Sequence, residues 1–151
     1  MDLSPTWEYV ADTVMGGVSQ GRLTLETVDG RDAARLTGVV SLDNNGGFLQ
    51  MAFDVTVDVS AWTGVEIDVA GNDETYDLRV RTDQLTRPWQ SFRASFTAQR
   101  EWTTVRIPFA DLTPHRTDAM FDPRRVRRIG ILAIGRVFNA DVAVSGVRLY
   151  R

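Results

Sequence analysis

Apolar side chains recur at every second position along most of the chain. In residues 48–57 these positions hold Leu49, Met51, Phe53, Val55 and Val57. Such alternation is typical of a strand that buries one face and exposes the other. The same alternation runs through residues 7–10, 22–28, 34–42, 65–69, 76–80, 90–96, 102–109 and 141–150.

Residues 129–134 differ because they are apolar almost without interruption, which is typical of a strand buried on both faces. No stretch of ten or more residues repeats its apolar positions with the period of a helix. Short alternating strands joined by turns predict an all-β fold, a β-sandwich or jelly roll. We expect residues 1–151 to form a single domain.

Turn signals separate the predicted strands. Asp29-Gly30 predicts a tight hairpin. Asp122-Pro123 predicts an N-cap with proline at the first position of one helical turn. Residues 58–64 predict a second such turn, and residues 110–122 show no pattern.

Two glycine pairs mark longer connections, one in residues 12–21 and one in residues 43–48. Glycine serves where φ is positive or where another backbone comes close, so we expect two shaped loops packed at one end of the sandwich. Their N–H groups either form a nest that holds an anion, or their Asp and Asn side chains hydrogen-bond within turns while apolar neighbours fill the core edge. The binding candidates in these loops are Asp12, Met15, Ser19, Asn44, Asn45 and Phe48.

A polar face follows from the same alternation. If the apolar residues of 76–80 point into the core, then Asp77, Arg79 and Arg81 point outward. On a concave outer face, arginine forks would suit carboxylates, phosphates or sugar hydroxyls; the alternative is a solvated face of cross-strand ion pairs. By the same parity the outward face includes Gln50, Glu66, Asp68, Ser91, Arg93, Thr104 and Arg106.

Tryptophans would supply the flat platform that a sugar ligand needs. Trp89 and Trp102 have outward parity, although a tryptophan beside a strand end is more often a partly buried sandwich residue.

Four of the five residues 124–128 are arginines. In a net-acidic chain such a cluster indicates a solvated turn paired with nearby aspartates rather than a phosphate site.

Composition narrows the function classes. The chain has a net charge of −3, and its 17 basic residues are all arginine, which argues against general nucleic-acid binding. Cysteine is absent, so disulfides, thiolate nucleophiles and cysteine-ligated zinc are excluded. No apolar run has the length of a membrane span and the N-terminus has no secretory pattern, so we expect no membrane insertion and a cytoplasmic location.

No catalytic constellation stands out. His115 is the single histidine, and no serine or cysteine lies near it in a recognised spacing. No EF-hand spacing supports a calcium site. We therefore expect a protein that is not an enzyme and that uses neither a metal nor another cofactor.

The order of these motifs resembles one family, the domain of Complex I intermediate-associated protein 30 (CIA30). The resemblance is carried by Trp7, by Asp-Thr-Val-Met-Gly-Gly-Val-Ser-Gln-Gly at 12–21 and by Gly-Val-Val-Ser-Leu-Asp-Asn-Asn-Gly-Gly-Phe at 38–48. It continues through residues 64–69, 76–82, 89–96, 102–109 and 128–132 and covers nearly the whole chain. The resemblance implies a jelly roll of the galactose-binding type. It also implies a role without catalysis, since eukaryotic members of the family act as assembly factors for respiratory Complex I.

Three functional hypotheses follow. The first is a non-catalytic binding domain that recognises a protein partner, in the assembly of a respiratory-type complex, through the glycine loops or the arginine face. The alternative is a carbohydrate-binding module that uses Trp89, Trp102, Arg79 and Arg81 on a concave face. The third is an enzyme that acts on a small anionic or sugar substrate.

Overall fold

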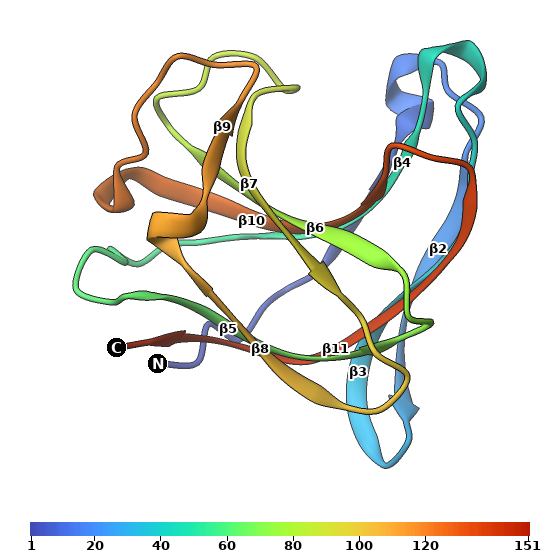
Figure 1. Ribbon diagram of the computed structural model, residues 1–151, viewed down its shortest axis with the longest axis horizontal. Helices are drawn as coiled ribbons and strands as arrows, with labels where there is room; N and C mark the ends of the chain where they lie inside the picture. Colours follow the sequence, from blue (N-terminus) through green and yellow to red (C-terminus); the bar gives the residue numbers. More distant parts are fainter.

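The computed structural model of the protein describes the backbone of residues 1–151 and every side chain except those of Met15 and Asn45. Two antiparallel sheets pack face to face, with the six-stranded sheet above the five-stranded one in Figure 1. The strand order is β1-β4-β10-β6-β7-β9 in the six-stranded sheet and β2-β3-β11-β5-β8 in the five-stranded sheet. The prediction of an all-β sandwich of the jelly-roll type is confirmed.

Strands and four short 3₁₀ helices make up the regular part of the described backbone. The six-stranded sheet comprises β1 (Glu8–Ala11), β4 (Phe48–Asp54), β6 (Thr75–Thr82), β7 (Ser91–Thr97), β9 (Thr113–His115) and β10 (Val126–Ile134). The five-stranded sheet comprises β2 (Gln20–Val28), β3 (Arg31–Val40), β5 (Gly64–Gly71), β8 (Thr103–Pro108) and β11 (Phe138–Tyr150). The 3₁₀ helices are η1 (Asp12–Met15), η2 (Asp43–Asn45), η3 (Phe109–Asp111) and η4 (Pro123–Arg125). Over the described residues, no helix has the length and apolar character needed to cross a membrane.

The alternating apolar residues meet between the two sheets. Leu49, Met51 and Phe53 of β4 are almost fully buried there, in one cluster with Leu36 of β3 and Ile67 of β5. Burying a side chain of this size contributes about 1.5–3 kcal/mol. The inner faces therefore hold the sandwich together and leave the two outer faces available for other tasks.

Two turn signals in the sequence are confirmed. Asp29 and Gly30 both have positive φ, 43° and 82°, as a tight hairpin between β2 and β3 requires. Asp122 caps η4, because its carboxylate accepts a hydrogen bond from the N–H of Arg124 at 3.0 Å.

Other boundaries differ from the sequence prediction. The alternation of 48–57 outlasts its strand, which ends at Asp54, and Val57 is exposed. Residues 58–63 form no helix but a single turn, in which the N–H of Trp62 donates to the carbonyl of Val59, and Gly64 already begins β5. The unpatterned segment 110–122 contains β9, a strand too short to leave a periodic signal.

Candidate functional site

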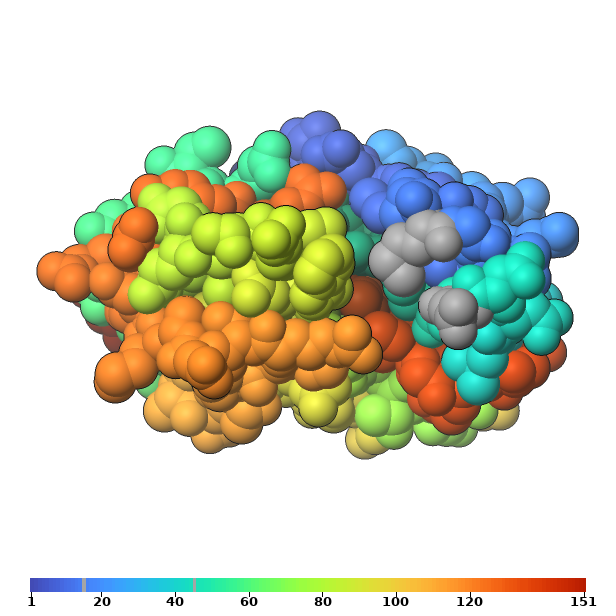
Figure 2. Space-filling view, turned by 90° about the horizontal axis from the view of Figure 1, so that it is seen from above, coloured from blue at the N-terminus to red at the C-terminus, as the bar shows by residue number. Residues whose placement is uncertain are grey.

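The outer face of the six-stranded sheet is bent into a trough. In Figure 1, β9 and its neighbouring loops rise on one side, and the loops that contain η1 and η2 rise on the other. Figure 2 looks down into the hollow between these two walls. We call this surface the concave face, and its outward-pointing residues are Phe48, Gln50, Ala52, Asp54, Asp77, Arg79, Arg81, Ser91, Arg93, Ser95, Arg128, Gly130, Leu132 and Ile134.

Burial confirms that the floor of the concave face lies deep. Ala52, Leu132 and Arg79 point away from the core between the sheets, yet they are only 0%, 6% and 8% exposed. Gly130 lies directly between Ala52 and Arg79 in the strand register. A Cβ at Gly130 would lie 2.4 Å from Nε2 of Gln50, so a larger residue there would displace the end of the Gln50 side chain.

Arg79 carries the buried positive charge of this floor. Its Nε and Nη2 donate to Oδ2 of Asp77 at 2.9 and 2.8 Å, and its Nη1 donates to Oγ of Ser91 at 3.2 Å. Ser95 adds a hydrogen bond to the other oxygen of Asp77 at 3.0 Å. The network fixes the Arg79 guanidinium against Asp77 and Ser91.

Arg81 anchors one wall of the trough. Its Nη1 donates to the backbone carbonyls of Arg87, Pro88 and Gln90 at 2.9, 2.9 and 2.7 Å. The chain between β6 and β7 thus folds over the guanidinium group, and Trp89 stays 52% exposed in this wall.

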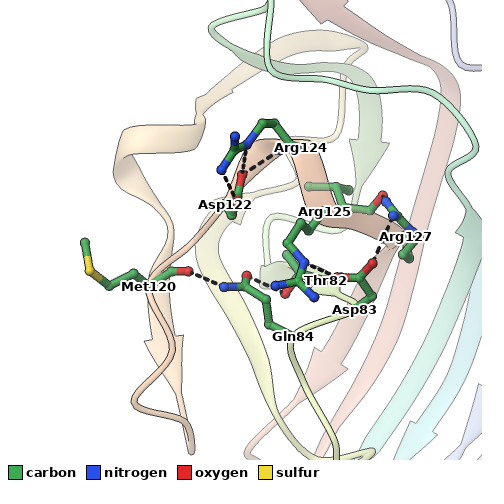
Figure 3. Close-up of polar contacts among 9 residues, drawn as sticks. Thr82, Asp83, Gln84, Met120, Asp122, Arg124, Arg125 and Arg127 are labelled. Atoms are coloured by element: carbon green, nitrogen blue, oxygen red, sulfur yellow. Dashed lines mark hydrogen bonds and ion pairs between the residues drawn. The ribbon is translucent and has the colours of Figure 1, made fainter.

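A second loop, residues 116–122, braces the same wall. Gln84 donates from Nε2 to the carbonyl of Met120 at 3.0 Å, a contact visible in Figure 3. Gln90 donates from Nε2 to the carbonyl of Arg116 at 3.1 Å. The wall is therefore tied to β9 and its continuation and does not stand alone.

The arginine-rich turn behind this wall is paired with carboxylates. Figure 3 shows Arg124 bound to Asp122, and both Arg125 and Arg127 bound to Asp83. These contacts agree with the prediction of a solvated turn whose arginines pair with nearby aspartates.

His115 lies among arginines. Burial lowers the pKa of its imidazole, and the positive charges of Arg79, Arg93 and Arg116 lower it further. The strand register places His115 opposite Ser91 at the edge of the concave face. At neutral pH the imidazole is uncharged there and supplies a neutral donor and acceptor.

The two glycine loops meet in the opposite wall. Asp12 is fully buried, and its carboxylate accepts hydrogen bonds from the N–H and the hydroxyl of Ser19 in its own loop. It also accepts from the N–H groups of Gly47 at 2.6 Å and Phe48 at 3.3 Å in the other loop. The prediction that the two loops pack together is confirmed, and the Asp12 carboxylate is what joins them.

Glycine is required at two positions around this carboxylate. A Cβ at Gly17 would lie 2.5 Å from Cγ of Asp12, and a Cβ at Gly46 would lie 2.5 Å from its Oδ2. Both distances are far below van der Waals contact. The glycine pairs therefore let two backbones close around one buried side chain.

The Asp12 carboxyl is held in its charged form. Burial alone would raise its pKa, but the hydrogen bonds from Ser19, Gly47 and Phe48 outweigh burial and keep the pKa below its usual value. Hydrogen bonds to a charged acceptor are stronger than neutral ones. The clamp therefore stiffens both loops.

Exposed aliphatic side chains lie on the loops that this clamp joins and on the neighbouring segments. The N–H of Gly135 donates to the carbonyl of Gly47 at 3.1 Å, which brings the β10–β11 turn against the second glycine loop. Aliphatic residues from these three connections and from the end of β3 are between 42% and 72% exposed. We call them the loop rim, and they are Val14, Val18, Val39, Leu42 and Val137.

The single outward face expected from parity is divided between the two sheets. Gln50, Ser91 and Arg93 lie with Arg79 and Arg81 on the concave face. The remaining members lie on the outer face of the five-stranded sheet, which is a correction to the sequence prediction; they are Glu66, Asp68, Thr104 and Arg106. Parity states which residues point outward but not to which sheet a strand belongs.

The two tryptophans do not form one platform, a further correction to the carbohydrate hypothesis. Trp102 precedes β8 of the five-stranded sheet, and its Nε1–H donates to the carbonyl of Val28 at 3.0 Å. The guanidinium of Arg31 lies 5.3 Å from the centre of its ring. Trp89, in contrast, lies in the wall of the trough.

The remaining loop candidates divide into exposed and undescribed residues. Asn44 is exposed, with φ of 56°. Phe48 is half-buried and pairs with Ile134 on the concave face, not at the edge of the core. The side chains of Met15 and Asn45 lie outside the described residues, so their predicted roles stay predictions.

Sequence reasoning missed the floor of the trough. Ala52 and Leu132 were not proposed as site residues, although the apolar run of 129–134 indicated burial on both faces and so pointed to Leu132.

Among the described side chains, no group of three His, Asp or Glu residues is arranged to hold a metal ion. A pocket of 640 Å³ lies elsewhere, between the N-terminal segment and β3, where Trp7 and Leu25 line it.

Two sheets, one hollowed outer face and one wall clamped by a buried aspartate define a jelly-roll domain of the kind found among carbohydrate-binding modules. The family 11 module from Clostridium thermocellum, in complex with a β-1,3-1,4-mixed-linked tetrasaccharide, has a TM-score of 0.78 to this chain at 11% identity. That match covers 99% of this chain and 92% of the module. The family 30 module of the cellulosomal cellulase Cel9D-Cel44B from the same organism has a TM-score of 0.71 at 18% identity, with 99% and 94% coverage. At such identities the likeness establishes the fold.

The family follows from the sequence itself. The model of the Complex I intermediate-associated protein 30 (CIA30) family matches residues 2–142. The chain therefore belongs to the CIA30 family, as its glycine-loop motifs suggested. A search of curated protein sequences gives no match.

Proposed function

We propose that the protein is a non-catalytic binding domain that docks a protein partner, a component of a respiratory-type complex, through the loop rim. The carrying observation is that five aliphatic side chains are exposed around a single clamped loop pair in a chain of net charge −3. Clusters of exposed apolar side chains mark interaction sites in soluble proteins. Membership of the CIA30 family supports the choice of partner.

The Asp12 clamp supports docking in physical terms. A loop that is already fixed in its binding conformation loses less conformational entropy when a partner binds. Asp12 fixes both glycine loops through charge-assisted hydrogen bonds. Val14 and Leu42 would then meet the partner without prior rearrangement of the backbone.

A triple variant, Val14→Ser, Val18→Ser and Leu42→Ser, tests the loop rim. Affinity capture from a lysate of the source organism, followed by mass spectrometry, should recover subunits of a respiratory-type complex with the unaltered protein and not with the triple variant. Leu25→Ser is the matched control, because Leu25 is 80% exposed on β2, away from the loop rim. Recovery of the same subunits with all three proteins would contradict the proposal.

A second candidate function, carbohydrate binding on the concave face, is favoured by the depth of the trough and by the exposed Trp89 in its wall. The family 11 module of the same fold was solved with a bound tetrasaccharide. Titration of the protein with that β-1,3-1,4-linked tetrasaccharide, monitored by tryptophan fluorescence, tests this candidate directly. A Trp89→Ala variant should bind more weakly, and unchanged binding would exclude Trp89 as the platform.

A further inference from the structure

The concave face places arginine opposite arginine at two neighbouring positions. Arg79 of β6 is the register partner of Arg93 of β7, and Arg81 of β6 is the register partner of Arg128 of β10. Like charges directly opposite each other in a sheet destabilise it. Both pairs lie on the same side of the same strand, so the cost is concentrated on this face.

Carboxylates neutralise only part of this charge. Arg79 is paired with Asp77, and Arg128 binds Asp54 and Glu8. Within the part of the chain whose side chains are described, three further arginines on or beside the face have no carboxylate partner; they are Arg81, Arg93 and Arg116. The trough therefore carries local positive charge in a chain of net charge −3.

Arg81 is held in a way that leaves its charge available. Its Nη1 binds three neutral carbonyls, which orient the guanidinium without cancelling its charge. Its Nε and Nη2 make no hydrogen bond with any group that the structure describes, and no polar side-chain atom among the described residues is both buried and unpaired, so these nitrogens reach solvent. A guanidinium fixed in this manner presents one edge of its fork to a ligand.

The neighbourhood of Arg81 also disfavours its positive charge. Burial lowers the pKa of its guanidinium, and the nearby Arg128 lowers it further. An anion bound between these two arginines would offset the repulsion from Arg128. At the edge of the sheet, the positive charges of Arg79 and Arg93 likewise lower the pKa of His115, and an anion bound there would offset them.

We propose that the concave face binds an acidic saccharide, with Arg81 and Arg93 contacting its carboxylates and Trp89 packing against a sugar ring. This inference rests on the second candidate function and adds the chemical class of its ligand; it does not depend on docking at the loop rim. Carboxylates fit the arginine fork in a bidentate manner. The exposed ring of Trp89, attached to the loop that Arg81 anchors, favours a saccharide over an acidic peptide.

Isothermal titration calorimetry at low ionic strength tests the proposal with two matched ligands, trigalacturonate and its carboxyl-reduced counterpart, galactotriose. Trigalacturonate should bind about tenfold or more tightly than galactotriose, a difference of about 1.4 kcal/mol, because charge-assisted hydrogen bonds to a carboxylate are stronger than neutral ones. Arg81→Gln and Arg93→Gln should each weaken trigalacturonate binding about tenfold. Arg22→Gln should leave it unchanged, because Arg22 is an exposed arginine without a carboxylate partner among the described side chains, on the outer side of β2.

The possible results distinguish this inference from the carbohydrate-binding function on which it rests and from docking at the loop rim. Equal binding of the two trisaccharides would overturn the acidic specificity and leave carbohydrate binding intact. Binding of hexaglutamate but of neither trisaccharide would overturn the acidic-saccharide inference in favour of an acidic peptide. No binding of any of the three ligands would overturn the inference as well, while titration with the β-1,3-1,4-linked tetrasaccharide decides separately on carbohydrate binding. The loop-rim triple variant should bind trigalacturonate like the unaltered protein, and a cooperative thermal unfolding transition would show that this variant is folded.

Discussion

The outer faces of the two sheets share one alternating pattern but arrange their charges in opposite ways. On the five-stranded sheet, Glu66 is the register partner of both Arg148 and Arg106, and both arginines bind its carboxylate. On the six-stranded sheet, Arg79 is instead the register partner of Arg93. One face is a sheet of compensated ion pairs, and the other repeats the same charge across neighbouring strands.

Under the acidic-saccharide proposal, the difference separates a solvated face from a ligand-binding face. Opposite charges across strands add a little stability, about 0.2–1 kcal/mol for each pair. Repeated positive charge has the opposite effect, so its presence calls for a compensating role. The shapes differ in the same sense, because loops rise on both sides of the six-stranded outer face and form the trough in which a ligand would be enclosed (Figure 1).

The largest expected loss of stability comes from removing the Asp12 clamp in the wall of the trough. Asp12→Ala leaves the buried donors of Ser19, Gly47 and Phe48 without their charged acceptor, so the free energy of unfolding should fall by about 3 kcal/mol or more. Urea denaturation measures this change. Asp43→Ala, at an exposed aspartate of the second glycine loop, is the control and should cost little. Equal losses for the two variants would show that the clamp has no special role.

The same clamp predicts a dependence on pH. Because the folded-state pKa of Asp12 lies below its unfolded value, its contribution is complete above the unfolded pKa, about 3.9, and is lost as the pH falls through the folded value. The stability gap between the unaltered protein and Asp12→Asn should therefore be constant above about pH 5 and narrow below pH 4. Thermal unfolding measured from pH 7 to pH 3 tests this. A gap that widens on acidification would reverse the assigned sign.

Removing an arginine from the compensated face should destabilise the protein. Arg148 donates to Glu66 at 2.6 Å and to Asp68 at 2.6 Å, so Arg148→Gln leaves two neighbouring carboxylates to repel each other. The expected loss is about 1 kcal/mol at low salt. Chemical denaturation measures this loss, and an unchanged midpoint would mean that these ion pairs contribute nothing measurable to the free energy of unfolding.

Removing an arginine from the concave face should instead stabilise the protein. Arg93→Gln relieves the repulsion with Arg79 across β6 and β7 and should raise stability by a few tenths of a kcal/mol at low salt. The gain should shrink as salt screens the repulsion. A loss of stability equal to that of Arg148→Gln would remove the distinction between the two faces.

Local chemistry predicted the strands, the Asp29-Gly30 hairpin and the Asp122 cap because each depends on a few neighbouring residues. The meeting of the two glycine loops was also predictable, since paired glycines between polar residues signal close backbone approach. The partner of that approach, the buried Asp12 carboxylate, required the structure, because residues 12 and 47 are distant in the chain.

The division of outward residues between two sheets could not be predicted in the same way. Strand order is set by long-range pairing, as in β1-β4-β10, and no local pattern encodes it. Trp89 and Trp102 share outward parity but belong to opposite parts of the sandwich for this reason. The depth of the trough likewise arises from the curvature of the whole sheet, so Ala52 gave no signal of its own.

The side chains of Trp89 and Trp102 offer the most direct test of the claim on which this comparison depends, the proposal that the arginine-bearing concave face binds a ligand. Their indole N–H signals can be followed by NMR while trigalacturonate is added to the protein. The account predicts that the Trp89 signal and the amides of β6 and β7 shift, while the Trp102 signal and the amides of β5 and β11 stay in place. Shifts at Trp102 and the five-stranded sheet, with Trp89 and β6 unmoved, would contradict it.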